Sequence, residues 1–126
     1  MTPREEIIWL SALLEGEGTF VLMQCGQDRK YFTVKIGVQM CDRDVIEHAA
    51  RLIGGIVHTC NPKGGYRPIH STSIYGEKAR WVMRQILPYM GERRSAKIRE
   101  LLAHPTAYNR TPKSWPFYEQ VVASPS

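Results

Sequence analysis

Residues 9–20 read WLSALLEGEGTF, a segment in which an apolar helix runs into two closely spaced glycines and then a strand. The helix is predicted over residues 7–15, because apolar side chains recur there at helical spacing. A capping box marks its start, with Thr2 as the N-cap, Pro3 at the first helical position and Glu5 three residues after the cap. The segment therefore predicts an N-terminal helix that is followed almost directly by a strand.

Small residues follow one face of this helix, and a carboxylate follows its end. Ala12 and Gly16 lie four residues apart, which lets the backbone of a second helix approach closely. Glu17 stands between two glycines, immediately before the predicted strand. If two copies of the helix pack together, their Glu17 carboxylates meet, and like charges that close repel unless a cation lies between them. Hard oxygen ligands of this kind suit Mg²⁺ or Mn²⁺.

The rest of the chain alternates strand pairs with helices. In residues 31–40 the apolar side chains recur at every second position, which is typical of a sheet with one buried and one solvated face. The expected elements after the first helix are strands over residues 19–25 and 31–40, a helix over 42–53 with Asp42 as its cap, strands over 56–60 and 67–75, and helices over 77–89 and 92–103. The prediction is an α+β domain of order α-β-β-α-β-β-α-α over residues 1–104, followed by an irregular tail over 105–126 that is rich in proline and aromatic residues.

Length and charge limit the possible classes of protein. The chain has 126 residues and a formal net charge of +5, which fits one domain and favours a polyanionic partner such as nucleic acid. A mildly basic protein without such a partner is the alternative. The three cysteines are widely spaced and predict no disulfide framework, so we expect a reduced, intracellular protein. Glu5 and Glu6 interrupt the N-terminal apolar residues, and no run approaches the roughly 20 apolar residues of a membrane span, so neither a signal peptide nor a membrane partner is expected.

Residues 10–18 resemble the LAGLIDADG motif, read position by position as Leu-Ser-Ala-Leu-Leu-Glu-Gly-Glu-Gly. Many members of that family end the motif in Glu-Gly-Glu-Gly followed by a small residue and phenylalanine, as this chain does. The likeness continues through the strand-to-helix passage at 38–54 and through 76–94, where a Leu-Pro-Tyr corner precedes two arginines. The resemblance covers residues 3–103 and implies the single-motif LAGLIDADG homing endonuclease fold, with a saddle-shaped antiparallel sheet.

The resemblance also implies an activity. Single-motif members cut double-stranded DNA site-specifically as homodimers on long pseudo-palindromic sites, with Mg²⁺ or Mn²⁺ as cofactor and no small-molecule substrate. Glu17 matches the acidic position that binds the catalytic metal, with the backbone carbonyl of Gly16 beside it, whereas Glu15 matches a more structural position. The interface between the two protomers is expected to comprise Ile8, Ser11, Ala12, Glu15 and Gly16.

Two positions depart from the family pattern. Many members place a glutamine near the end of the second strand, and here that alignment falls on Met40, with Gln39 beside it and expected to point the other way. Many members also place a lysine after the third helix, where this chain has Arg93 and then Arg94. An arginine neutralises phosphate but is a poor proton shuttle, because it stays protonated. A non-cleaving DNA- or RNA-binding relative, repressor-like or maturase-like, therefore stays open as an alternative, and a protein-interaction module is a third.

In the family, the saddle of strands lies in the major groove of DNA. The outward face of residues 19–25 is unusually apolar here, and apolar groups touch thymine methyls without reading hydrogen-bond patterns. Two registers are open for residues 67–75, since Ser71 and Ser73 occupy the core face in one of them. The residues expected to contact DNA are Gln27, Arg29, Lys30, Tyr31, Thr33, Lys35, His58, Lys63, Arg67, His70, Thr72 and Arg94.

A zinc site or a His-Asn-His nuclease motif around His58-Thr59-Cys60-Asn61 is disfavoured. Such sites need about four ligands at fixed spacing, and no second pair of ligands lies nearby in the sequence.

Overall fold

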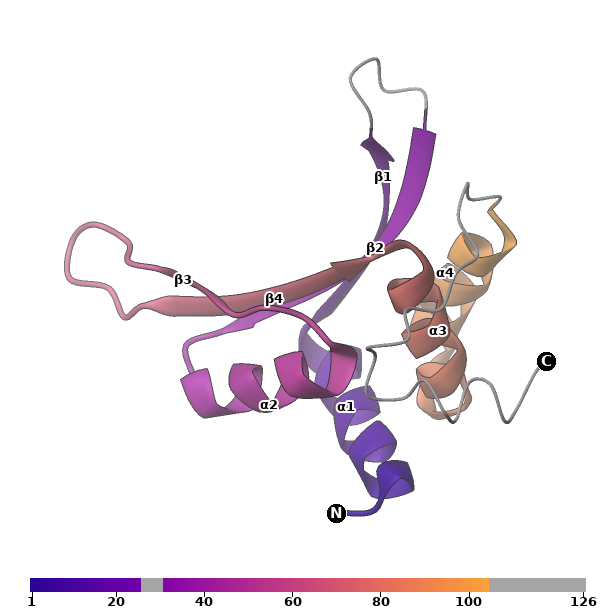
Figure 1. Ribbon diagram of the computed structural model, residues 1–126, viewed down its shortest axis with the longest axis horizontal. Helices are drawn as coiled ribbons and strands as arrows, with labels where there is room; N and C mark the ends of the chain where they lie inside the picture. Colours follow the sequence, from indigo (N-terminus) through magenta and orange to yellow (C-terminus); the bar gives the residue numbers. More distant parts are fainter. Residues whose placement is uncertain (26–30, 105–126) are drawn as a thin grey trace.

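The computed structural model describes residues 1–25 and 31–104, and Figure 1 shows how their elements are arranged. In chain order these elements are α1 (Pro3–Glu17), β1 (Gly18–Cys25), β2 (Tyr31–Met40), α2 (Arg43–Ile53), β3 (His58–Cys60), β4 (Ile69–Tyr75), α3 (Gly76–Ile86), the 3-10 helix η1 (Leu87–Tyr89) and α4 (Glu92–Ala103). This order confirms the predicted α+β class. The predicted tail lies outside the described residues. None of the described helices combines the length and apolar character that crossing a membrane requires.

The four strands form one antiparallel sheet in the order β1-β2-β4-β3. The long strand β2 pairs with β1 over Tyr31 to Val38 and with β4 over Lys35 to Met40, so residues 35–38 are paired on both sides. Figure 1 shows the sheet strongly bent along β2, with the described helices on its convex side and none of them on its concave side. The predicted saddle is therefore present, and one face of it is open.

The core lies between the sheet and the helices. Alternate residues of β2 supply its centre, since Val34, Ile36 and Val38 are buried whereas the intervening side chains point to the open face. Helix residues at helical spacing complete the core, and its largest fully buried members include Leu14, Ile46, Ile53, Met83, Ile86, Ile98 and Leu101.

Helix α1 begins as predicted and ends later. The Thr2 N–H donates to the Glu5 carboxylate at 3.0 Å and the Glu5 N–H donates to the Thr2 hydroxyl at 3.1 Å, so the capping box is complete. The bond from the Thr2 backbone, together with the Thr2 side chain, lowers the pKa of Glu5 below its ordinary value. The helix continues through Gly16 and Glu17 and is capped by Gly18, where a Cβ atom would lie 2.6 Å from the Leu14 carbonyl oxygen. Glycine is therefore required where α1 turns into β1.

Several predicted boundaries are wrong by two or three residues. The third strand begins at His58 rather than at residue 56, because Ile56 lies in an exposed segment after the left-handed cap Gly54. The fourth strand begins after Pro68, which has no N–H to donate to a sheet. Helix α3 gives way to the η1 turn at Leu87-Pro88-Tyr89. Asp42 is the N-cap of α2 as predicted, although its side chain makes no capping bond.

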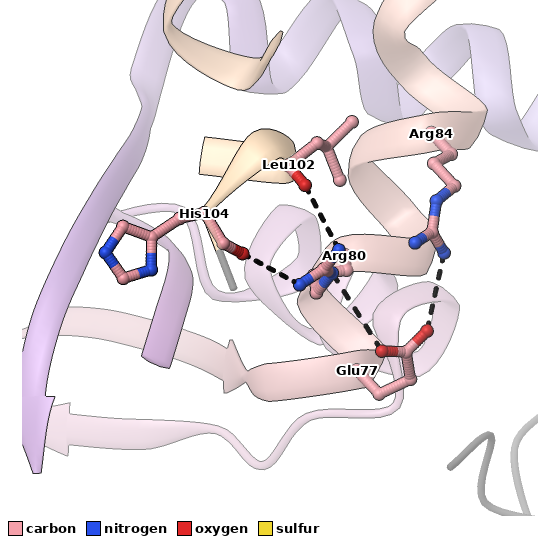
Figure 2. A network of polar contacts seen from close by, with 5 residues as sticks. All are labelled: Glu77, Arg80, Arg84, Leu102 and His104. Atoms are coloured by element: carbon pink, nitrogen blue, oxygen red, sulfur yellow. Dashed lines mark hydrogen bonds and ion pairs between the residues drawn. The ribbon is translucent and has the colours of Figure 1, made fainter. Parts of the chain in front are cut away.

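A polar network fastens the end of α4 to α3 (Figure 2). The Arg80 guanidinium donates to the backbone carbonyls of Leu102 and His104 at 3.1 and 3.2 Å. Glu77 pairs with Arg80 and with Arg84, at nitrogen-to-oxygen distances of 4.0 and 3.4 Å. The cation at the carbonyl end of α4 complements its helix dipole, so α4 is held at this end by α3.

Candidate functional site

The strand register determines which side chains share the open face. Directly paired residues of antiparallel strands project to the same side of the sheet. Three rows that each join three strands therefore cross the open face, and they are Val21-Lys35-Tyr75, Thr19-Gly37-Ser73 and Gln39-Ser71-His58. Polar groups are concentrated in the second and third rows, near the end of α1.

A hollow of about 360 Å³ lies in the middle of this face. Gly37 is at its centre, and the absence of a side chain there leaves room above the sheet. The lining residues are Glu17, Thr19, Lys35, Gly37, Val38, Gln39, Ser71 and Ser73. The hollow thus brings one carboxylate, one ammonium, one amide and three hydroxyls to a single place on the open sheet.

Glu17 reaches the hollow from the last residue of α1, where it is exposed. The carbonyl end of a helix carries partial negative charge, and α1 has no basic residue in its last turn. A carboxylate there adds to that negative charge, so a cation bound beside it is favoured. Gly16, whose carbonyl was predicted to assist, belongs to the same exposed turn.

The oxygen donors of one protomer suit a hard divalent cation in kind but not in number. Within residues 1–25 and 31–104, no three or more His, Cys, Asp or Glu side chains gather as metal ligands. The same finding gives no support to a zinc site at His58 and Cys60.

The predicted alignment of Met40 with the cleavage-site glutamine is corrected by the register. Met40 pairs with His70 on the helix-covered side, where it packs against the core. Gln39 is on the open side and lines the hollow together with Glu17. The chain therefore presents a glutamine to the hollow, one residue earlier than the alignment placed it.

The two arginines after η1 differ in their surroundings. Arg93 is exposed and Arg94 is partly buried. The Arg94 Nη1 atom donates to the Gly18 carbonyl oxygen at 2.6 Å, and its guanidinium lies 5.6 Å from the centre of the Phe20 ring. Arg94, predicted as a DNA contact, thus has one nitrogen engaged at the α1–β1 junction, and neither arginine lines the hollow.

Two predicted DNA contacts on β4 face the core and are therefore wrong. His70 is 7% exposed and Thr72 is fully buried. The His70 ring nitrogen Nδ1 lies 2.9 Å from the Thr59 hydroxyl, which ties β4 to β3. Ser71 and Ser73 occupy the open face instead. The sequence of β4 permits both registers because polar residues occupy both of its faces, and the structure has the register that buries Thr72.

The remaining predicted contacts fall into three groups. Thr33 and Lys35 are on the open face, as expected. His58 is exposed on β3, and Lys63 and Arg67 are exposed in the β3–β4 loop. Tyr31 opens β2, and Gln27, Arg29 and Lys30 lie outside the described residues.

Helix α1 exposes a narrow stripe of side chains. Ile8 is 43% exposed, Ala12 and Gly16 are exposed at the following helical turns, and no atom lies within 4 Å of a Cβ built on Gly16. Ser11 is 2% exposed and its hydroxyl donates to the Ile7 carbonyl at 2.7 Å, so its predicted place in an intersubunit interface is wrong. Glu15 accepts a 3.2 Å hydrogen bond from the Gly91 N–H and is thus engaged within the protomer.

Comparison with known proteins identifies the fold. No protein-family model and no curated protein sequence matches the chain. Among solved structures, it is similar to the homing endonuclease I-CvuI in complex with its target, with a TM-score of 0.63, 15% identity, and coverage of 79% of this chain and 65% of that one. The chain is also similar to the archaeal intron-encoded homing endonuclease I-Vdi141I complexed with DNA, with a TM-score of 0.56, 14% identity, and coverage of 76% of this chain and 65% of that one.

The group I intron-encoded homing endonuclease I-CeuI complexed with DNA is also similar, with a TM-score of 0.55, 15% identity, and coverage of 79% of this chain and 53% of that one. The alignments span less than two thirds of the length of each of these proteins. The chain has the LAGLIDADG homing endonuclease fold that its sequence predicts.

Proposed function

Since the chain has the fold of homing endonucleases whose structures contain DNA, we propose that it is a site-specific, metal-dependent endonuclease of double-stranded DNA. One observation carries the proposal. Glu17 stands at the exposed end of α1, on the edge of a polar hollow in a concave sheet face that the described helices leave uncovered. An uncovered concave sheet on a chain with a net charge of +5 suits the major groove of a duplex.

The proposed active form is a homodimer. The exposed stripe of Ile8, Ala12 and Gly16 on α1 is shaped for close approach of an identical helix, because two of its three side chains are very small. This packing brings the two Glu17 carboxylates together, so that the oxygen ligands which one protomer lacks are supplied by its partner and by phosphate oxygens of DNA. Two-fold symmetry then predicts a pseudo-palindromic site.

We assign different roles to the residues around the hollow. The Glu17 carboxylate and the Gly16 carbonyl would hold Mg²⁺ or Mn²⁺, which polarises phosphate and lowers the pKa of an attacking water. The Gln39 amide and the hydroxyls of Ser71 and Ser73 would orient the phosphate and water by hydrogen bonds. Glu17 and Lys35 are the charged side chains among the described lining residues, and in our proposal the bound ion supplies most of the chemistry.

The strands set the length of the DNA site. A strand rises about 3.3 Å per residue, so one seven-residue strand spans about seven base pairs. With loops and two protomers, the site is expected to cover about 14 to 22 base pairs. Residues 1–104 carry this activity in our proposal, and with DNA as the substrate and exposed free thiols at Cys41 and Cys60 we propose an intracellular location.

The test is selection followed by cleavage. Duplexes with a randomised centre are bound by the protein in Ca²⁺, recovered, cloned into plasmids and treated with Mg²⁺, Mn²⁺ or chelator. The proposal expects a long two-fold symmetric site, and cleavage of both strands only with Mg²⁺ or Mn²⁺. Tight binding of such a site without cleavage in either ion would instead favour the non-cleaving relative. Failure to enrich any duplex would overturn the DNA-binding function itself.

A further inference from the structure

We infer that Lys35 supplies the positive charge that meets a central DNA phosphate in the hollow. The resemblance to the family gives this role to Arg93. The inference rests on the proposed function and adds a catalytic contact to it. Lys35 is in the middle strand of the open face, and it is the one cationic side chain among the described residues that line the hollow. Glu17 lines the same hollow from the end of α1.

The Lys35 side chain lies beside Gly37. The two residues are neighbours on the open face of β2, because they are two positions apart. A Cβ built on Gly37 would lie 3.2 Å from the Ser73 hydroxyl and 3.5 Å from Cε of Lys35, so the lysine stem passes within contact distance of position 37. The Lys35 Nζ is 5.8 Å from the centre of the Tyr75 ring in the neighbouring strand, a weak cation–π contact. A side chain larger than a methyl group at position 37 would therefore press on the lysine stem.

Charge balance gives this placement a function. A phosphate that enters the hollow meets the Glu17 carboxylate, which repels it, and an ammonium on the same surface offsets that repulsion. Arg93 does not line the hollow, and Arg94 lies against the Gly18 carbonyl. Lys35 is therefore the cation best placed to neutralise charge where it develops on a phosphate during hydrolysis.

Neutral phosphates locate the contact without requiring cleavage. On the selected duplex, each phosphate in turn is replaced by an uncharged methylphosphonate, and affinity in Ca²⁺ is measured for wild type and for Lys35→Met. At one symmetric pair of central phosphates, wild type is expected to lose about 10-fold in affinity. Lys35→Met is expected to show a similar loss on the unmodified duplex and no further loss at that pair. Equal losses for the two proteins at every phosphate would overturn the inference.

Cleavage at saturating protein separates catalysis from binding. With Mg²⁺, Lys35→Met is expected to slow single-turnover cleavage about 100-fold, and Lys35→Arg to recover part of that loss. Gly37→Val should slow it as well, because a branched side chain occupies the path of the lysine stem while favouring a strand. Lys97→Met, which removes a cation that pairs with Glu100 on α4, is the matched control and should cut at the wild-type rate.

Each outcome has a distinct meaning. Wild-type cleavage by saturated Lys35→Met would overturn the catalytic assignment and leave the proposed endonuclease intact. If the neutral-phosphate experiment shows that Lys35 contacts a central phosphate but the wild-type protein never cleaves DNA, the proposed endonuclease activity is wrong and the Lys35 contact stands.

Discussion

Arg94 and Gly18 join the start of α4 to the end of α1, through a 2.6 Å hydrogen bond from the guanidinium to the Gly18 carbonyl. The reverse contact is made by Glu15 of α1, which accepts from the Gly91 N–H at the cap of α4. Each helix therefore places a side chain of favourable charge on the end of the other, acidic at the amino end of α4 and basic at the carbonyl end of α1. Glu17 projects from the junction that these two contacts fix.

Loss of this junction should lower stability. Arg94→Met is expected to reduce the free energy of unfolding by about 1 to 3 kcal/mol, because a carbonyl loses a charged donor. Glu15→Gln should cost less, since the amide oxygen can still accept from Gly91. Urea unfolding measures both, with Arg99→Met on the exposed side of α4 as the control. An Arg94→Met protein as stable as the control would contradict the account of the junction.

Thr72 offers a stabilising substitution. Its side chain is fully buried, and its hydroxyl has no hydrogen-bond partner among the described residues. Thr72→Val replaces that hydroxyl with a methyl group of similar size, so we expect the free energy of unfolding to rise by about 1 kcal/mol. Affinity for the selected DNA should not change, because Thr72 faces the core. Weakened DNA binding by a stably folded Thr72→Val protein would support the other register, in which Thr72 lies on the DNA-binding face.

A substitution at Gly16 tests whether this face of α1 is the dimer interface. Apart from the backbone of α1 and the neighbouring residues, no described atom lies within 4 Å of a Cβ at this position, so Gly16→Leu should not destabilise the isolated protomer. Removing a helical glycine even favours α1 by up to about 1 kcal/mol. The dimer should nevertheless dissociate, because a bulky side chain separates the two helices. Light scattering at matched concentrations, with exposed Ala96→Leu on α4 as control, measures this. A dimeric Gly16→Leu protein would exclude this face as the interface.

Neighbouring substitutions test which side of β2 takes part in chemistry. Gln39→Leu removes an amide from the hollow, whereas Met40→Leu exchanges one apolar side chain for another against the core. We expect single-turnover cleavage to fall about 10-fold or more for Gln39→Leu and to stay near wild type for Met40→Leu. The opposite order would return the catalytic position to Met40.

The order of elements could be predicted from local chemistry because several boundaries have their own signal. The capping box at Thr2 and Glu5 begins α1, and the strict alternation in residues 31–40 identifies β2 with its correct bounds. Position 18 requires glycine, since a Cβ there would lie 2.6 Å from the Leu14 carbonyl oxygen. These are interactions between residues close in sequence, which a sequence pattern records directly.

The site was only partly predictable because it depends on register. Thr72 and Ser73 have similar polarity, so sequence alone could not decide which of them faces the core, and His70 and Thr72 were placed on the wrong side with it. The hollow combines the end of α1 with three strands, and its lining depends on which residues of different strands are paired. Ser11 likewise looked like an interface residue because of its size, although its hydroxyl bonds inward.

The most direct test of the claim that Glu17 holds the catalytic metal compares Glu17→Gln with wild type in Mg²⁺ and in Ca²⁺. The substrate is the plasmid that carries the selected DNA site. Glutamine keeps the shape of the side chain and removes the charge that a divalent cation needs. We predict that cleavage falls by several orders of magnitude, while DNA affinity in Ca²⁺ stays the same or rises because a repulsive charge is gone. Glu15→Gln, whose carboxylate is engaged with Gly91, should show a much smaller loss. Cleavage by Glu17→Gln at the wild-type rate would contradict the account.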